Sequence, residues 1–266
     1  MEAHRLKEYS CLTSAGACFV LSVVYVASLY IWNSPYFRDH PSTIKKRFLS
    51  VFIMMFISPL FLYYFSQEHI LQKATIWQLL GLRLHGLLPA IFIPMFLTMT
   101  LFLGPLTMQG YSGLWKLYAE PMYWLTNITN LIWLRNHVVA PLSEEFTFRA
   151  CMLPLLLQCF RPMTAIFVCP LFFGVAHFHH MLERMRNGLD FKRALMISCH
   201  FIAPFAAHAF CNHMGFPDFA EILTYKEPQR SMLMSLFVTG LVAWCLLLTP
   251  LTNPAWYDNH LFWKGH

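Results

Sequence analysis

Three ionisable residues stand close together in a stretch of the sequence that is otherwise apolar. Glu144 and Glu145 are adjacent, Arg149 follows four residues after Glu145, and residues 138–155 carry no other charge. Charged side chains at membrane depth cost on the order of 2.5 to 3.5 kcal/mol each. The grouping therefore predicts a functional site, in which a carboxylate activates a water molecule by taking its proton.

Two later segments carry polar residues at helical spacing. Phe173 and His177 are four residues apart, as are His208 and Asn212, so each pair shares one face of a helix. A His beside a carboxylate can help to pass a proton to a leaving amine. His and Asn side chains can also donate hydrogen bonds to the oxyanion that develops at an attacked carbonyl. These residue types predict hydrolysis by an activated water molecule.

The two glutamates are expected to have different roles. Arg149 lies one helical turn after Glu145 and can neutralise and orient that carboxylate, which leaves Glu144 as the base. Two other interpretations remain open. A set of Glu and His residues resembles zinc ligands, although the sequence lacks His-Glu-x-x-His. A Glu-Arg-His network could also only hold the helices of a transporter or scaffold together.

The elements that must position these residues are membrane-spanning helices. The 266 residues are 57% hydrophobic and 12% charged, with a mean hydropathy of +0.48. Ordinary soluble domains carry about 25% charged residues. Because no long hydrophilic stretch is present, we expect an all-α, polytopic helix bundle in a single membrane domain over residues 1–266, with lipid and no nucleic acid around it.

Seven apolar stretches approach the length of about 17–25 residues that a spanning helix needs. They cover residues 10–32, 48–65, 86–108, 138–160, 163–180 and 231–250, with a shorter candidate at 194–212. Residues 119–136 are amphipathic and are expected at the membrane interface. The eight cysteines lie nearly all in apolar stretches without ligand spacing, which predicts buried, free thiols.

The three motifs also carry a family resemblance. They are Glu144-Glu145-x-x-x-Arg149, Phe173-x-x-x-His177 and His208-x-x-x-Asn212, in this order on hydrophobic segments. Together they resemble the CAAX-protease and bacteriocin-processing superfamily. The surrounding residues 169–180 and 211–217 resemble the eukaryotic type II CAAX prenyl endopeptidases of that superfamily, and the likeness covers most of the chain.

The resemblance implies a multi-pass enzyme of the endoplasmic-reticulum membrane. Such an enzyme removes the last three residues from farnesylated or geranylgeranylated Cys-a-a-X proteins, such as Ras-like small GTPases. It implies no metal, no other cofactor and no nucleophilic cysteine. By the same resemblance, Glu144 and His177 activate the water and His208 and Asn212 stabilise the oxyanion. Glu145, Arg149 and Phe173 then support this set.

One segment departs from the family pattern. Relatives carry an additional apolar helix between the second and third motifs, whereas here Ser198 runs directly into Cys199. The chain therefore has about one helix fewer than its relatives. If a helix begins at Ala194 on the side where His177 ends, His208 lies about 20 Å deeper in the bilayer. A catalytically impaired isoform, or a non-enzymatic membrane scaffold of the same family, is the alternative function.

Overall fold

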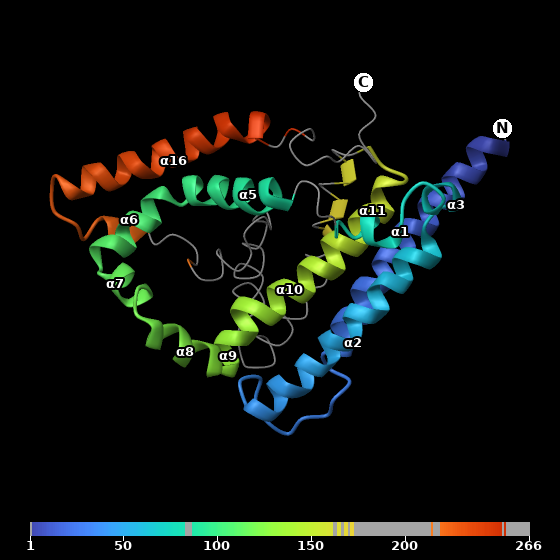
Figure 1. Cartoon of the computed structure of the whole chain (residues 1–266), viewed down its shortest axis with the longest axis horizontal. Coiled ribbons are helices and arrows are strands. Elements are labelled where there is room, and N and C mark those ends of the chain that lie inside the picture. The colour runs from blue at the N-terminus through green and yellow to red at the C-terminus, as the bar shows by residue number, and fades with distance from the viewer. Residues whose placement is uncertain are drawn as a thin grey trace. The chain divides into compact units, whose positions relative to one another are not determined.

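The computed structural model describes residues 2–82, 87–161, 164–165, 168–169, 171–172, 214, 219–251 and 253. Within these ranges every regular element is a helix, which confirms the all-α fold class (Figure 1). The chain divides into two compact units, which are residues 1–83 with 139–204 and residues 84–138 with 205–266. A single domain over the whole chain stays a prediction.

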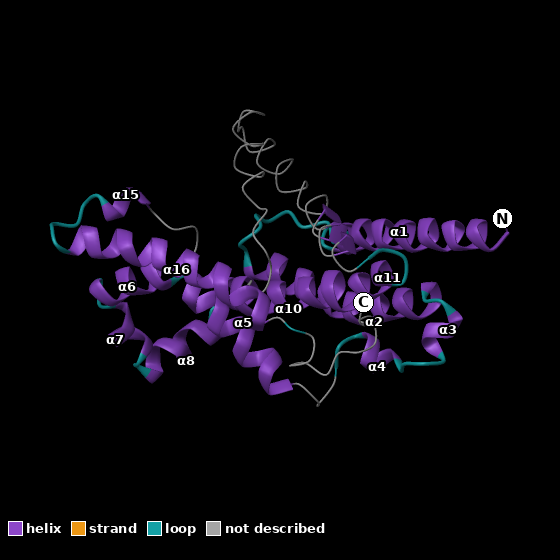
Figure 2. Ribbon diagram, turned by 90° about the horizontal axis from the view of Figure 1, so that it is seen from above, coloured by secondary structure: helices purple, strands orange, loops and turns teal. Residues whose placement is uncertain are grey.

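The first unit is built on an antiparallel pair of long helices, α1 (Glu2–Ser28) and α2 (Pro41–Phe65), which lie side by side (Figures 1 and 2). Trp32 Nε1 donates a hydrogen bond to Ser50 Oγ at 2.6 Å. Ser50 Oγ in turn donates to the carbonyl oxygen of Ser28, also at 2.6 Å. These bonds join the end of α1 to the third turn of α2. Two short helices follow, α3 (Glu68–Leu71) and α4 (Ile76–Leu79).

A third helical run of the first unit packs against both α1 and α2. It consists of α10 (Ala140–Glu144), the π-helix η2 (Glu145–Met152) and α11 (Leu153–Leu157), without a break between them. Small polar side chains are buried along this seam, namely Ser22, Ser58, Ser143 and Thr147. Small residues allow helices to approach closely, and their hydroxyls bond across the gap, as Ser58 Oγ and Thr147 Oγ1 do at 3.3 Å.

The second unit is centred on α16 (Gln229–Leu251), which packs along α5 (Leu87–Leu101) and α6 (Leu103–Tyr111). Gly240 permits the close approach, because a Cβ at this position would lie 2.6 Å from the carbonyl oxygen of Thr100. The remaining elements are α7 (Leu114–Tyr118), α8 (Pro121–Thr129), α9 (Leu131–Leu134), α15 (Phe219–Ile222) and the π-helix η1 (Arg135–Val139), at the boundary of the units.

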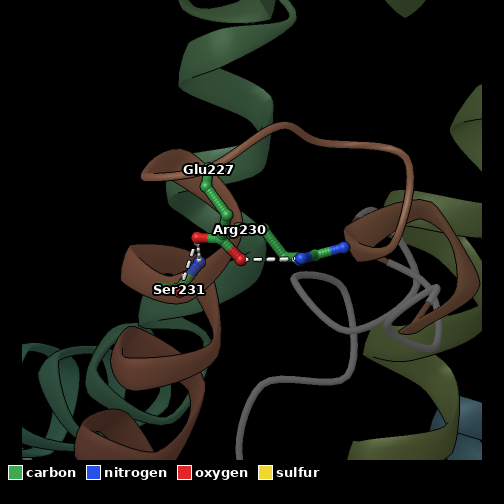
Figure 3. A network of polar contacts seen from close by, with 3 residues as sticks. All are labelled: Glu227, Arg230 and Ser231. Carbon is green, nitrogen blue, oxygen red and sulfur yellow. Dashed lines mark hydrogen bonds and ion pairs between the residues drawn. The ribbon is translucent and has the colours of Figure 1, made fainter.

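A carboxylate holds the first turn of α16. The side chain of Glu227 accepts hydrogen bonds from Arg230 Nε at 2.8 Å and from Ser231 Oγ at 2.5 Å (Figure 3). The backbone N–H of Ser231 also donates to this carboxylate, at 3.2 Å. The hydrogen bonds from Ser231 and Arg230 lower the pKa of Glu227 below its ordinary value of 4.5.

Three of the predicted spans, at 10–32, 48–65 and 231–250, are borne out by the structure. Among the described residues, three helices are long and apolar enough to cross a membrane, and they are Cys11–Ser28, Pro41–Phe65 and Gln229–Leu251. The expected uninterrupted span 86–108 differs, because α5 and α6 meet at an angle of 71°. Pro105 has no N–H for the carbonyl of Leu101, which explains the break. The chain is a multi-pass membrane protein.

Four other predicted stretches either lie mostly or wholly outside the described residues or form several short helices. The stretch 194–212 and most of 163–180 lie outside the described residues. The stretch 138–160 forms the run of α10, η2 and α11 instead of one regular helix. Residues 119–136 form short helices with exposed apolar side chains, such as Met122, Leu125 and Ile128 on α8, and their position at the membrane interface stays a prediction.

The six described cysteines are free thiols, as the sequence predicts. Cys18, Cys151 and Cys169 are buried, whereas Cys245 is exposed on α16, contrary to the expectation of burial. The other two cysteines, Cys199 and Cys211, lie outside the described residues.

Candidate active site

The paired glutamates lie where an α-helix changes into a π-helix. Glu144 is the last residue of α10 and Glu145 is the first residue of η2. π-helical turns are rare, and they occur frequently at functional sites. The local backbone at the acid pair is therefore irregular, which the apolar pattern of the sequence alone does not reveal.

Prolines explain the position of both π-helices. η1 ends at Val139, two residues before Pro141, and η2 ends at Met152, two residues before Pro154. A proline has no N–H to offer to the carbonyl four residues earlier, so it interrupts the regular α-helical hydrogen bonds. The sequence thus places a backbone irregularity on each side of Glu144.

One face of this run is buried in the first unit. The buried residues are Ser143, Thr147, Phe148, Cys151, Met152, Leu155 and Leu156. The thiol of Cys18 on α1 points at the carbonyl oxygen of Met152 at a distance of 3.8 Å. Ser22 on the same helix bonds to the sulfur of Met152, also at 3.8 Å. The face is therefore held against α1 at Met152 by two side chains one turn apart.

The two glutamates have different surroundings. Glu144 is half-buried and interacts electrostatically with Tyr25 on α1. Glu145 forms an ion pair with Arg149, and its side chain is 28% exposed against 45% for Arg149. The ion pair that the spacing predicts is thus present. This pairing agrees with the expected support of Glu145 by Arg149, and the assignment of Glu144 as base stays a prediction.

A cysteine connects the second motif's segment to this site. Cys169 donates from its thiol to the carbonyl oxygen of Phe148 in η2, at 3.0 Å. It also interacts electrostatically with Arg149 and Glu145. Cys169 stands eight residues before His177. The segment that leads to the second motif therefore contacts η2 at Cys169.

The other predicted site residues lie outside the described part of the chain. These residues are Phe173, His177, His208 and Asn212. Their approach to Glu144 therefore stays a prediction. Within the described ranges, no three His, Cys, Asp or Glu side chains gather as a metal-binding group. The zinc alternative needs the two histidines, so it stays open.

Some residues that contact the site were not singled out from the sequence. Tyr25 and Ser143 bond to each other beside Glu144, with 2.8 Å between their hydroxyl oxygens. A signal for them was present, because polar side chains inside apolar spans usually pair with one another. The partner of each could not be read from the sequence, since they are 118 residues apart.

Comparisons with a family model and with known proteins point to the same family. Residues 125–214 match the family described as Type II CAAX prenyl endopeptidase Rce1-like. The chain is 43% identical over 258 residues to CAAX prenyl protease 2 of Rattus norvegicus, covering 94% of this chain and 83% of that protein. CAAX prenyl protease 2 of Homo sapiens is 40% identical over 279 residues, which cover 94% of this chain and 84% of that protein. No solved structure matches.

A plant relative shows the same likeness at lower identity. CAAX prenyl protease 2 of Arabidopsis thaliana is 29% identical over 290 residues, covering 92% of this chain and 91% of that protein. The human and plant alignments, over 279 and 290 residues, are longer than the whole chain of 266 residues. Both relatives therefore have residues within the aligned region that this chain lacks. At these identities and coverages, the chain belongs to the family of type II CAAX prenyl endopeptidases.

Proposed function

We propose that this chain is an endopeptidase of the endoplasmic-reticulum membrane. It removes the last three residues from proteins that carry a farnesyl or geranylgeranyl group on the cysteine of a C-terminal Cys-a-a-X. Ras-like small GTPases belong to this substrate class. The observation that carries the proposal is the contrast at the helix junction, where Arg149 pairs with Glu145 and Glu144 lies beside Tyr25. The names of the relatives, which are CAAX prenyl proteases, support the same activity.

The proposed chemistry uses a water molecule as the nucleophile. Glu144 and His177 take a proton from the water as its oxygen attacks the carbonyl carbon of the prenylated cysteine. His208 and Asn212 donate hydrogen bonds to the oxyanion, and each well-placed donor contributes about 3 to 4 kcal/mol to the transition state. The peptide bond between this carbon and the following nitrogen then breaks, and the proton passes to the leaving amine of the released tripeptide.

The pairing of Glu145 with Arg149 supports this division of roles. Two adjacent carboxylates without a cation would repel each other, and this repulsion would favour protonation of one of them. Arg149 offsets the charge of Glu145. Glu144 can then remain ionised, as a general base must be before it takes a proton.

The membrane setting fits the substrate class. A prenyl chain transfers favourably into lipid, by about 0.8 kcal/mol for each buried CH₂ group. The bond to be cleaved lies next to that anchor, so the catalytic carboxylate must be reached from within or beside the bilayer. Glu144 follows an apolar segment and lies against the spanning helices α1 and α2, which agrees with this requirement.

A peptide-trimming assay on the purified full chain in lipid vesicles tests the proposal. The substrate is a farnesylated Cys-a-a-X peptide, and mass spectrometry detects the released tripeptide. We expect Glu144→Gln to lower kcat by about 100-fold to 10,000-fold, the range that general-base catalysis contributes. Glu68→Gln is the matched control, because Glu68 is exposed on the short helix α3.

The outcomes separate the proposal from its alternative. Turnover that is lost in Glu144→Gln and kept in Glu68→Gln supports the endopeptidase, and the same peptide without the prenyl group should be cleaved far more slowly. If the unsubstituted chain inserts into lipid but releases no tripeptide, the active-enzyme proposal is wrong. The chain is then the impaired isoform or scaffold that its shorter sequence allows.

A further inference from the structure

Tyr25 brings a buried hydroxyl group to the residue next to Glu144. It lies on α1, is 4% exposed, and has its hydroxyl oxygen 2.8 Å from Oγ of Ser143. Ser143 is 1% exposed and directly precedes Glu144 in the last turn of α10. The contact therefore crosses from the spanning helix α1 to α10 at the position of the acid pair.

The direction of this hydrogen bond follows from the number of hydrogens. Ser143 has a single hydroxyl hydrogen, which points to the carbonyl oxygen of Ala140 at 3.1 Å. Tyr25 must then be the donor to Ser143. The resulting chain of bonds, from Tyr25 through Ser143 to Ala140, connects α1 to the backbone of α10 and restrains rotation of its last turn.

The ring of Tyr25 provides a second contact, on the other side of Glu144. It packs edge-to-face against Phe148 of η2, with 5.5 Å between the ring centroids and an interplanar angle of 77°. Phe148 is also the residue whose carbonyl oxygen accepts from Cys169. The side chain of Tyr25 thus contacts Ser143, one position before Glu144, and Phe148, four positions after it. These two residues lie on opposite sides of the change from α-helix to π-helix.

A packing role alone does not require the hydroxyl group. Phenylalanine would fill the same space, whereas a buried tyrosine hydroxyl needs a hydrogen-bond partner to offset its desolvation. Here the hydroxyl meets its partner beside the carboxylate of Glu144, with which Tyr25 also interacts electrostatically. These contacts couple the hydroxyl of Tyr25 to the orientation of Glu144.

We propose that Tyr25 is a positioning residue, which uses its contacts with Ser143 and Phe148 to fix the direction of the Glu144 carboxylate. This inference rests on the proposed role of Glu144 as the base. Tyr25 acts through its neighbours and takes no part in the proton transfer. Because a misplacement of about 1 Å can cost about 100-fold in rate, such a residue strongly affects kcat.

The first test measures kcat and KM for the farnesylated peptide. Tyr25→Phe keeps the ring and removes the hydroxyl, and we expect kcat to fall by about 10-fold to 100-fold while KM changes by less than about twofold. Ser143→Ala should have the same effect. The double variant should be no slower than either single variant, because both remove one hydrogen bond.

Two control variants separate positioning from general packing. Ser22→Ala removes another buried hydroxyl from the same helix seam, three residues before Tyr25. Tyr64→Phe removes a tyrosine hydroxyl from an exposed position on α2. Both should keep the kcat of the unsubstituted chain. If Tyr25→Phe keeps it as well, or if Ser22→Ala lowers kcat equally, Tyr25 has no special relation to Glu144.

A second measurement does not depend on turnover. A hydrophobic carbodiimide reacts with carboxyl groups in membranes, and mass spectrometry gives its rate of reaction at Glu144 and Glu145 separately. We expect Tyr25→Phe to change the rate at Glu144 by about threefold or more, because the carboxylate of Glu144 is then no longer held in one orientation. The rate at Glu145 should stay unchanged. An unchanged rate at Glu144 overturns the positioning role. Failure of the unsubstituted chain to cleave peptide overturns only the proposed function.

Discussion

At the scale of single residues, the charge balance of the acid pair can be tested at Arg149. Arg149→Met removes the arginine that pairs with Glu145, next to the carboxylate of Glu144. We expect kcat for the farnesylated peptide to fall by about 10-fold or more, because the repulsion between the adjacent carboxylates then favours protonation of one of them, and a protonated Glu144 cannot act as base. Peptide trimming in lipid vesicles measures the effect.

The double variant of this ion pair is the internal control. Glu145→Gln combined with Arg149→Met removes both charges and leaves Glu144 as the only carboxylate of the pair. Replacing both partners usually costs much less than removing one. We therefore expect the double variant to recover part of the activity lost in Arg149→Met. Equal loss in both variants would contradict the charge-balance explanation and favour a direct role for Arg149.

Glu227 gives a prediction about pH outside the spanning segments. Its pKa is lowered in the folded protein by the bonds from Ser231 and Arg230, so it is depressed relative to the unfolded chain. Its contribution to stability is present above the ordinary pKa of 4.5 and is lost as the pH falls through the lowered value. Glu227→Gln should therefore lower the melting temperature in detergent at about pH 7, and this effect should become smaller as the pH is lowered below 4.5. An effect of equal size above and below this pH would contradict the linkage.

At the scale of helices, the close approach of α16 and α5 depends on Gly240. Gly240→Ala adds a Cβ that would lie 2.6 Å from the carbonyl oxygen of Thr100, so the helices must separate. We expect a loss of about 1 to 3 kcal/mol in stability, as other overpacking substitutions show. Thermal unfolding in detergent measures it. Gly16→Ala is the matched control, because its Cβ meets nothing within 4 Å, and alanine in a helix is more favourable by about 0.5 to 1 kcal/mol.

The helices also show which features the sequence could predict. Long apolar runs indicate spans directly, and α2 and α16 end within a residue or two of the predicted stretches at their C-terminal ends, at Phe65 and Leu251. The break at Phe102 and the two π-helices depend on which backbone carbonyls the prolines leave unpaired, and an apolar pattern carries no such information. The ion pair of Glu145 is local and was predictable. The contact of Tyr25 with Ser143 depends on tertiary packing and was not.

At the scale of the whole molecule, the number of membrane crossings decides which side the third motif enters from. The human and plant alignments, over 279 and 290 residues, are longer than this chain, whereas the rat alignment covers 258 residues, so the helix missing between the second and third motifs stays a prediction. An apolar helix of about 20 residues inserted between Ser198 and Cys199 adds one crossing. For the span that the sequence predicts at 194–212, it would therefore reverse the side of entry. A glycosylation acceptor at the C-terminus reports whether the crossing has formed.

We expect the chain with the inserted helix to trim the farnesylated peptide at least as fast as the chain as it stands, because the relatives carry a helix at this place. A Gly/Ser insertion of the same length at the same join is the control, since it adds flexible chain without a crossing. If turnover appears only after the apolar helix is inserted, the chain is an impaired isoform, and its first motif is intact while its third is misplaced. If the two insertions have the same effect on turnover, depth in the membrane is not what limits activity.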